Sequence, residues 1–103
     1  MQLENRVMKD NVFYFHNVEN DGSHLNIRFL GDPNKSNIVR ILRFSEIQDY
    51  KEEWYNKDEQ SIEMLIGLHE KQKGDGVDYL LHTDQREIFF YTEIEPLVED
   101  LSN

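Results

Sequence analysis

Residues Val12 to Leu30 read VFYFHNVENDGSHLNIRFL and give the clearest indication of the fold. Two runs rich in β-branched and aromatic residues flank Asp21-Gly22, a dipeptide typical of a hairpin turn because both of its positions accept a positive φ. With Asp21-Gly22 as a two-residue loop, Tyr14 faces Phe29, and apolar residues gather on one side of the hairpin. We therefore predict an antiparallel β-hairpin over residues 12–30.

The composition of the whole chain agrees with β structure. The 103 residues include no alanine, which is the strongest helix former. By contrast, 28 residues are β-branched or aromatic, and these types suit a pleated, half-buried surface. We therefore do not expect a helical bundle.

A loop and a further strand follow the hairpin, and then a helix is expected. Residues 31–37 combine Gly, Asp, Pro, Asn and Ser, which predicts a loop, and residues 38–44 predict a strand. Ser45 and Gln48 have the spacing of a capping box. Ile47, Tyr50 and Trp54 recur at helical spacing. These features predict a helix over residues 45–56 that packs on the sheet.

Residues 62–94 predict a meander of three strands. Residues 62–70 fit a helix or a strand by periodicity, and Gly67 favours the strand. Turns are expected at Asp75-Gly76 and at Asp84-Gln85, with Leu81 facing Ile88 across the second turn. In this register one inner face is formed by Met64, Ile66, Leu68, Tyr79, Leu81, Ile88 and Phe90.

These elements combine into one predicted domain over residues 1–103. Residues 95–101 predict a short C-terminal helix, with Pro96 at its first position. The expected fold class is α+β, with an antiparallel sheet of about six strands and the helix 45–56 packed on one face.

The charge of the chain excludes several classes of partner. Eleven Lys and Arg residues against 21 Asp and Glu residues leave a net charge of −10. Nucleic acids and anionic membranes need clustered positive charge, so neither is expected as a partner. Residues 46–103 alone carry a net charge of −11, which predicts a one-sided acidic surface. No cysteine, no long apolar run and no secretory signal is present, so we expect a cytoplasmic protein.

Only one set of residues suggests catalysis. In the predicted meander His69 lies opposite His82, and His82 lies opposite Glu87. Such a row could bind a divalent metal, or orient His82 as the general base of a hydrolase. The alternative is that the three residues are polar side chains on the outer face of a sheet. We favour that alternative, and expect no enzyme and no cofactor.

Two surfaces are candidates for binding. The first is the acidic face of the expected helix, with Glu52 and Glu53 as charges and with Tyr50, Tyr55 and Tyr91 as aromatic anchors. The second is formed by Leu80, Phe89 and Tyr91. It is either covered by the expected helix or exposed as a site for homo-oligomerisation.

The leading functional hypothesis is a small acidic binding protein that neutralises a more basic protein partner. In size, charge and lack of catalytic motifs the chain is similar to immunity proteins of bacterial toxin systems and to phage-borne inhibitors. That likeness assigns no residue a role. The alternatives are an oligomerisation domain of a larger assembly and a hydrolase at His69, His82 and Glu87.

Overall fold

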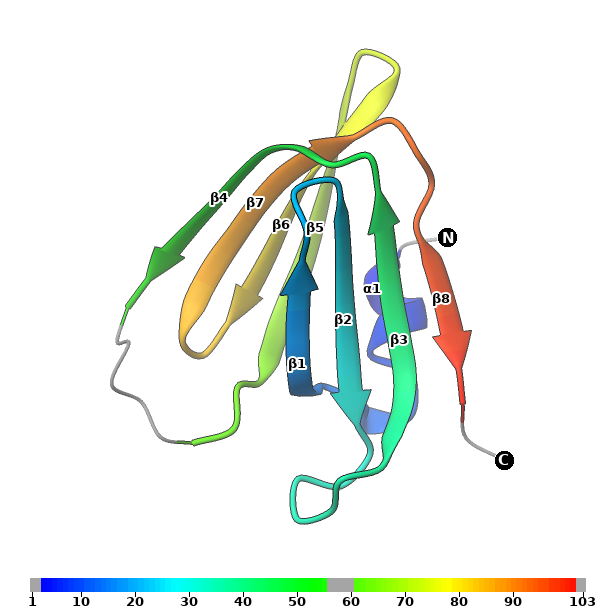
Figure 1. Ribbon diagram of the computed structural model, residues 1–103, viewed down its shortest axis with the longest axis vertical. Helices are drawn as coiled ribbons and strands as arrows, with labels where there is room; N and C mark the ends of the chain where they lie inside the picture. The colour runs from blue at the N-terminus through cyan, green and yellow to red at the C-terminus, as the bar shows by residue number, and fades with distance from the viewer. Residues whose placement is uncertain (1–2, 56–60, 102–103) are drawn as a thin grey trace.

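The computed structural model describes residues 3–55 and 61–101, and within them the protein is nearly all β. Eight strands form two four-stranded antiparallel sheets (Figure 1). The first sheet has the order β1-β2-β3-β8 and contains β1 (Tyr14–Asn20), β2 (His24–Leu30), β3 (Ile38–Ser45) and β8 (Leu97–Asp100). The second has the order β4-β7-β6-β5 and contains β4 (Gln48–Trp54), β5 (Leu65–Lys73), β6 (Gly76–Thr83) and β7 (Arg86–Thr92).

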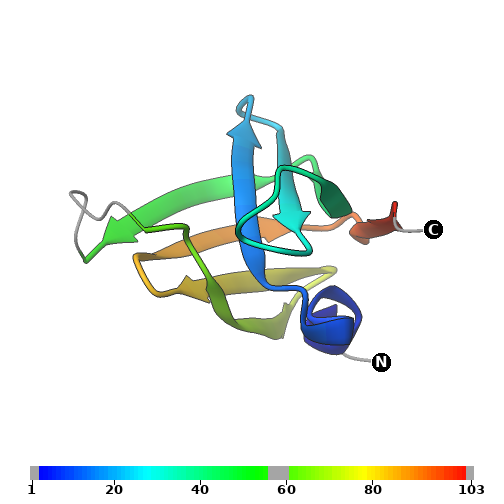
Figure 2. The same ribbon diagram turned by 90° about the horizontal axis from the view of Figure 1, so that it is seen from below.

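The two sheets pack face to face around one core. Viewed along the long axis, β1 crosses β4, β7 and β6 at a steep angle (Figure 2), as in orthogonally packed sheets. Phe44 lies at the centre of the core, with its ring centroid 5.0 Å from that of Tyr79 and 4.6 Å from that of Phe90. Edge-to-face pairs of this kind add to the free energy gained by burial. Both sheets therefore contribute to a single hydrophobic interior.

The predicted hairpin is present, but its partners are shifted by two residues near the turn and by one residue at Tyr14 and Phe15. The chain reverses between the strands over residues 21–23, where the Asp21 carboxylate accepts the backbone N–H groups of Ser23 at 3.0 Å and His24 at 2.7 Å. These backbone hydrogen bonds lower the pKa of Asp21. A bulge at His16 then exchanges the two faces of β1, so that Phe15 is buried in place of Tyr14.

The expected helix over residues 45–56 is wrong, because this segment forms β4. Ser45 remains in β3, and Glu46 adopts a φ of 51°, which turns the chain into the second sheet. The spacing of Tyr50 and Trp54 also fits a strand, since alternate residues of β4 pair with the inward-facing residues of β7. The Ser45–Gln48 pattern therefore marks a corner between sheets and not a helix cap.

The expected C-terminal helix is also wrong, because residues 97–100 form β8 beside β3. Cross-strand ion pairs support this pairing: Arg40 donates to Asp100 at 2.5 Å and Arg43 to Glu99 at 3.1 Å. The Arg40 hydrogen bond lowers the pKa of Asp100. With β4 and β8 included, the described residues contain eight strands in place of about six, and the α+β class is corrected to nearly all-β.

The meander over residues 62–94 is confirmed as three antiparallel strands, and the strand interpretation of residues 62–70 holds from Leu65 onward. Leu81 faces Ile88 as predicted. The turn between β5 and β6, however, is Gly74-Asp75, with Gly74 at a φ of 59°. Gly76 belongs to β6, where a Cβ would lie 2.6 Å from the Thr92 carbonyl oxygen. Its role is close approach to β7 and not chain reversal.

A second irregularity corrects the predicted inner face of the meander. A bulge between Leu65 and Gly67 leaves Ile66 51% exposed, and Leu65 is buried in its place. Met64 is half-buried, and the other predicted members of that face are buried as expected: Leu68, Tyr79, Leu81, Ile88 and Phe90.

Two short helical segments, α1 (Leu3–Val7) and the 3-10 helix η1 (Lys9–Asn11), lie beside β5 and β3. The Glu4 carboxylate accepts the Leu68 N–H at 2.9 Å, and Arg40 donates to the carbonyl oxygens of Val7 and Lys9. Within the described residues no helix is long and apolar enough to cross a membrane.

Candidate functional site

Two acid-rich regions lie at opposite ends of the sheets, and the first surrounds a buried arginine. Arg86, at the start of β7, is 7% exposed. It pairs with Glu63 through two hydrogen bonds of 2.8 and 2.9 Å and with Glu52 at 3.1 Å. Its guanidinium lies 4.4 Å from the Trp54 ring centroid. We call Arg86, Glu52, Glu63, Tyr50, Trp54 and Thr83 the Arg86 cluster.

Additional hydrogen bonds within the Arg86 cluster fix the carboxylates of Glu52 and Glu63. Glu52 accepts from the Trp54 indole N–H at 2.8 Å and from the Tyr50 hydroxyl, and Glu63 accepts from the Thr83 hydroxyl at 2.7 Å. Burial opposes ionisation of Glu52, but these two donors and Arg86 outweigh it and lower the pKa of Glu52. Burial and the neighbouring Glu52 raise the pKa of Tyr50. One guanidinium thus pairs with both carboxylates of the cluster, and these contacts hold β4, β7 and residue 63 together.

The structure separates the five residues predicted to bind a partner. Tyr50 and Glu52 belong to the Arg86 cluster on the inner face of the second sheet. Glu53 and Tyr91 lie on its outer face, since they are at positions paired with Glu87 and Asp78, and Tyr55 follows β4 with its ring 6.1 Å from that of His82. The expected acidic helix face does not exist.

The outer face of the second sheet carries the predicted oligomerisation residues. Leu80 and Phe89 are paired neighbours, and they line a shallow hollow of about 410 Å³ together with Asp49, His69 and Lys71. Lys51 lies 5.8 Å from the Phe89 ring centroid, and Lys73 lies 5.7 Å from that of Tyr91. In the described part of the chain no helix covers this face.

The predicted His–His–carboxylate row is only half formed. His82 lies opposite Glu87 as expected, but His69 lies opposite Leu80 because the β5–β6 register is shifted. Among the described residues no group of three or more His, Asp or Glu side chains is arranged to hold a metal. The geometry therefore gives the proposed hydrolase no complete site.

The second acid-rich region is formed by the connections at the other end of the sheets. Four connecting segments meet there, over residues 21–23, 46–47, 74–75 and 93–96 (Figure 1). They contain no Lys or Arg and carry five exposed carboxylates, Asp21, Glu46, Asp75, Glu93 and Glu95, which we call the acidic end. Within residues 3–55 and 61–101 none of the five forms an ion pair with Lys or Arg.

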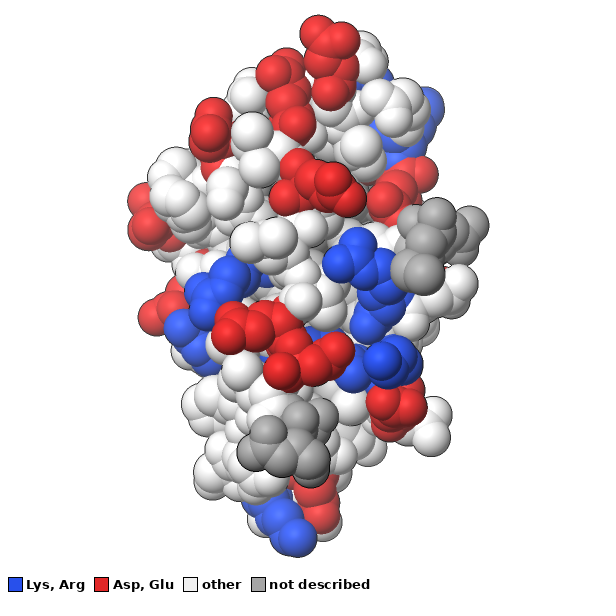
Figure 3. Space-filling view, turned by 90° about the vertical axis from the view of Figure 1, so that its right-hand side faces the viewer, with Lys and Arg blue, Asp and Glu red and all other residues white. Residues whose placement is uncertain are grey.

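The distribution of charge over one side of the molecule agrees with this location. In Figure 3, Asp and Glu side chains gather over the upper part of the face, toward the β5–β6 turn of Figure 1. Lys and Arg side chains lie mostly around the middle, close to acidic side chains. The excess of negative charge is therefore displaced toward the acidic end.

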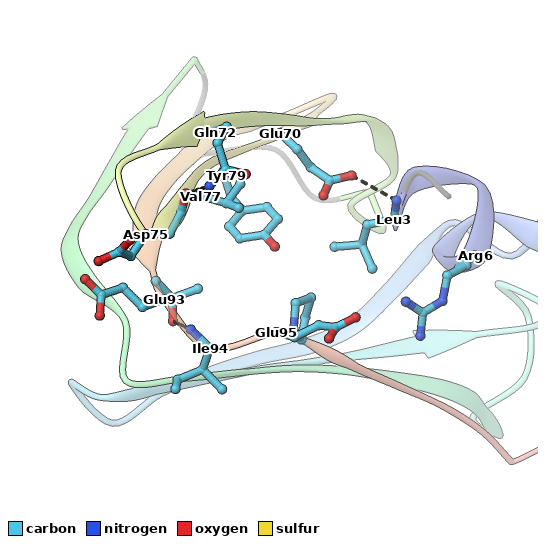
Figure 4. A pocket seen from close by; sticks show the side chains of 13 residues that line it. Leu3, Arg6, Glu70, Gln72, Asp75, Val77, Tyr79, Glu93, Ile94 and Glu95 are labelled. Carbon is cyan, nitrogen blue, oxygen red and sulfur yellow. Dashed lines mark hydrogen bonds between the residues drawn. The ribbon is translucent and has the colours of Figure 1, made fainter.

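A cleft of about 260 Å³ opens at the acidic end between α1, the β5–β6 hairpin and the segment before β8 (Figure 4). Glu70, Asp75, Glu93 and Glu95 surround it, and among the described residues Arg6 is the one basic residue that lines it. The Tyr79 hydroxyl points into it from the inner side. Burial, followed by the charges of Glu70 and Glu95, raises the pKa of Tyr79 to about 12. The hydroxyl is therefore neutral at physiological pH.

No pattern in the sequence indicates this cleft or the Arg86 cluster. Tyr79 was placed correctly on the inner face of the meander, but nothing in its neighbourhood along the chain marks it as a site residue. The sequence predicts that residues 93–94 end the meander and that residues 95–96 begin a helix. The position of residues 93–96 opposite Glu70 depends on the pairing of β8 with β3, which is a contact between segments far apart in the sequence.

Comparisons with known proteins identify a related fold and no family. No family model matches the chain, and no curated protein matches it. The chain is similar to the crystal structure of an uncharacterized protein from Neisseria gonorrhoeae, with a TM-score of 0.61 and 13% sequence identity. The match covers 87% of this chain and 92% of the other. At this identity the likeness concerns the arrangement of the strands alone.

Proposed function

We propose that the protein is an acidic binding protein that neutralises a basic protein partner, and that it contacts this partner with the acidic end. The observation that carries the proposal is the contrast between paired and unpaired carboxylates. Glu52 and Glu63 share an ion pair with Arg86, Glu99 pairs with Arg43 and Asp100 pairs with Arg40.

In the described part of the chain none of the five carboxylates of the acidic end pairs with Lys or Arg, and only Asp21 lies near a histidine, 3.5 Å from His24. Exposed charges of one sign gathered at one end produce a field that attracts an oppositely charged protein and speeds its association. Tyr91 adjoins this end, and its hydroxyl donates to Glu93 at 3.1 Å. An aromatic side chain in this position supplies the apolar contact that charge alone lacks.

The test is kinetic and uses a partner identified from the source cell. The immobilised full chain is used to capture proteins, basic candidates are purified, and association is followed by stopped flow from 0.01 to 0.15 M salt. The Debye length falls from about 30 to 8 Å over this range. We expect the association rate constant to exceed the unsteered ~10⁵–10⁶ M⁻¹s⁻¹ at low salt and to fall steeply as salt is added.

A matched pair of variants locates the contact. Glu93→Lys with Glu95→Lys reverses charge at the acidic end, and Glu53→Lys with Glu87→Lys makes the same change in net charge on the outer face of the second sheet. Only the first variant should slow association strongly. Equal slowing by both variants, or an association rate indifferent to salt, would contradict the proposal.

A second candidate function, self-association, is favoured by the uncovered Leu80–Phe89 hollow on the outer face of the second sheet. It predicts a dimer at micromolar concentration in sedimentation velocity, and conversion to a monomer by Phe89→Glu or Tyr91→Glu. A wild-type monomer under these conditions would eliminate this candidate.

A further inference from the structure

The cleft at the acidic end has an unusual combination of a fixed, unpartnered hydroxyl on its inner side and carboxylates around its mouth. The Tyr79 side chain is held rigidly, because it is 5% exposed and its ring stacks on Phe90 at 5.4 Å and meets Phe44 at 5.0 Å. Its hydroxyl is aimed into the cleft (Figure 4). Among residues 3–55 and 61–101 nothing hydrogen-bonds to it. The hydroxyl oxygen is not enclosed by protein but is open to the cleft, so it is available to a ligand bound there.

The charges around the cleft determine which partner suits the hydroxyl. Glu70 accepts the Leu3 N–H at 2.9 Å, and Glu93 accepts the Tyr91 hydroxyl, but neither is paired with a cation in the described structure. Within residues 3–55 and 61–101, Asp75 and Glu95 complete a set of four carboxylates that line the cleft against one arginine, Arg6. The resulting negative potential favours a positively charged group that donates hydrogen bonds.

The size of the cleft and the residues of its walls further limit the class of ligand that it can bind. Leu3, Val77, Ile94 and Pro96 supply apolar wall, which suits the methylene stem of a lysine or arginine side chain. A volume of about 260 Å³ lies below that of typical sites for larger ligands. No three of the described carboxylates converge as metal ligands, which argues against a divalent cation.

We propose that this cleft binds a single organic cation, the guanidinium or ammonium group of a basic side chain of the partner, with the Tyr79 hydroxyl oxygen accepting a hydrogen bond and Glu70 and Glu95 balancing the charge. This inference rests on the proposed function for the source of the cation. The same chemistry would also accept a free alkyl diamine.

The experiment is an NMR titration of the full chain with small probes. The probes are Nα-acetyl-arginine methyl ester, its neutral isostere Nα-acetyl-citrulline methyl ester, and putrescine. We expect saturable shifts at Leu3, Tyr79 and Glu95 with the arginine ester and none with the citrulline ester. Equal shifts with both esters would overturn the inference, because the cleft would then not select for charge.

Variants separate a built site from diffuse attraction. Tyr79→Phe should weaken binding of the arginine ester about tenfold, as expected for loss of a hydrogen bond to a charged group. Glu70→Gln and Glu95→Gln should each weaken it about two- to fivefold. Glu53→Gln, at a distant position on the outer face, is the matched control and should change nothing. Equal loss in Glu53→Gln and Glu95→Gln would overturn the site.

The inference and the proposed function can fail separately. If a basic partner associates in a salt-dependent way but the arginine ester neither binds nor competes with it, the inference is overturned and the proposed function stands. If the arginine ester and putrescine bind at the cleft while no basic partner is found, the proposed function is overturned and the cleft is a site for a free cation. Competition of the arginine ester with the partner supports both.

Discussion

The two ends of the molecule use the same chemical groups in opposite ways. At the Arg86 cluster, carboxylates, a tyrosine hydroxyl and an indole ring surround a guanidinium that belongs to the chain itself. At the cleft, carboxylates, a tyrosine hydroxyl and apolar walls surround a space that no residue of the described chain fills with a paired cation. The comparison teaches that acidic groups stabilise the fold where a cation satisfies them, and remain available for a partner where none does.

The largest expected effect on stability comes from removing the guanidinium group at the centre of the Arg86 cluster. Arg86→Met leaves Glu63 and Glu52 close together without a counter-charge and should lower the free energy of unfolding by about 3–5 kcal/mol, as found when one partner of a buried pair is removed. Urea denaturation at pH 7 measures this loss. The matched control is Arg28→Met, which breaks the exposed pair with Glu19 and should cost at most about 1 kcal/mol.

The two tyrosine hydroxyls provide the next test of the comparison. Tyr50→Phe removes a donor to the Glu52 carboxylate and should cost about 1.5–3 kcal/mol. Tyr79→Phe removes a hydroxyl that has no partner in the described chain, so its free energy of unfolding should stay within about 0.5 kcal/mol of wild type. A loss at Tyr79 as large as that at Tyr50 would mean that the cleft hydroxyl is structural.

The pH dependence of stability should include a contribution from Glu52 of the Arg86 cluster, beside those of Asp21 and Asp100, whose pKa values are also lowered. The lowered pKa of Glu52 means that its contribution is present above the ordinary glutamate pKa of about 4.3 and is lost as the pH falls through the lower value in the fold. Denaturation curves between pH 6 and 3 should therefore show stability declining less in Glu52→Gln than in wild type. Equal declines would show that Glu52 is not the titrating group.

The smallest effect on stability is expected from removing negative charges at the acidic end. Glu93→Gln with Glu95→Gln removes two unpaired charges from a region of like charge and should leave the free energy of unfolding unchanged or raise it by about 0.5 kcal/mol at low salt. Added salt should erase any gain, because it screens exposed charges. A substantial loss of stability would mean that these carboxylates have a structural partner.

The sequence predicted those parts of the fold that depend on neighbours along the chain. The hairpin over residues 12–30 and the meander over residues 62–94 were recognised, and the β6–β7 register was correct because only two residues separate those strands. The β1–β2 and β5–β6 turns were predicted at the wrong residues, because an Asp-Gly pair indicates a chain reversal but does not determine which residues form the loop. In the β5–β6 hairpin, Gly76 was needed for close packing on Thr92.

The larger errors came from contacts between distant segments. Residues 48–54 have helical spacing, but β7 offers them a hydrogen-bonded edge and an inner face where Tyr50, Glu52 and Trp54 meet Arg86. Residues 97–100 find a similar edge on β3. Tyr50, predicted as an aromatic anchor, and Glu52, predicted as a charge of the same surface, lie instead in the Arg86 cluster, and no local pattern of the sequence indicates this.

The hydrogen bond between Glu4 of α1 and the Leu68 N–H has a consequence for the behaviour of the protein at high concentration. β5 is the last strand of its sheet, and an uncovered edge of this kind is a template on which another chain can add a strand. Glu4 occupies the Leu68 N–H, which would otherwise be open to a strand of another molecule. The N-terminal segment therefore opposes edge-to-edge aggregation. Its few residues thus contribute to keeping each molecule separate from its copies.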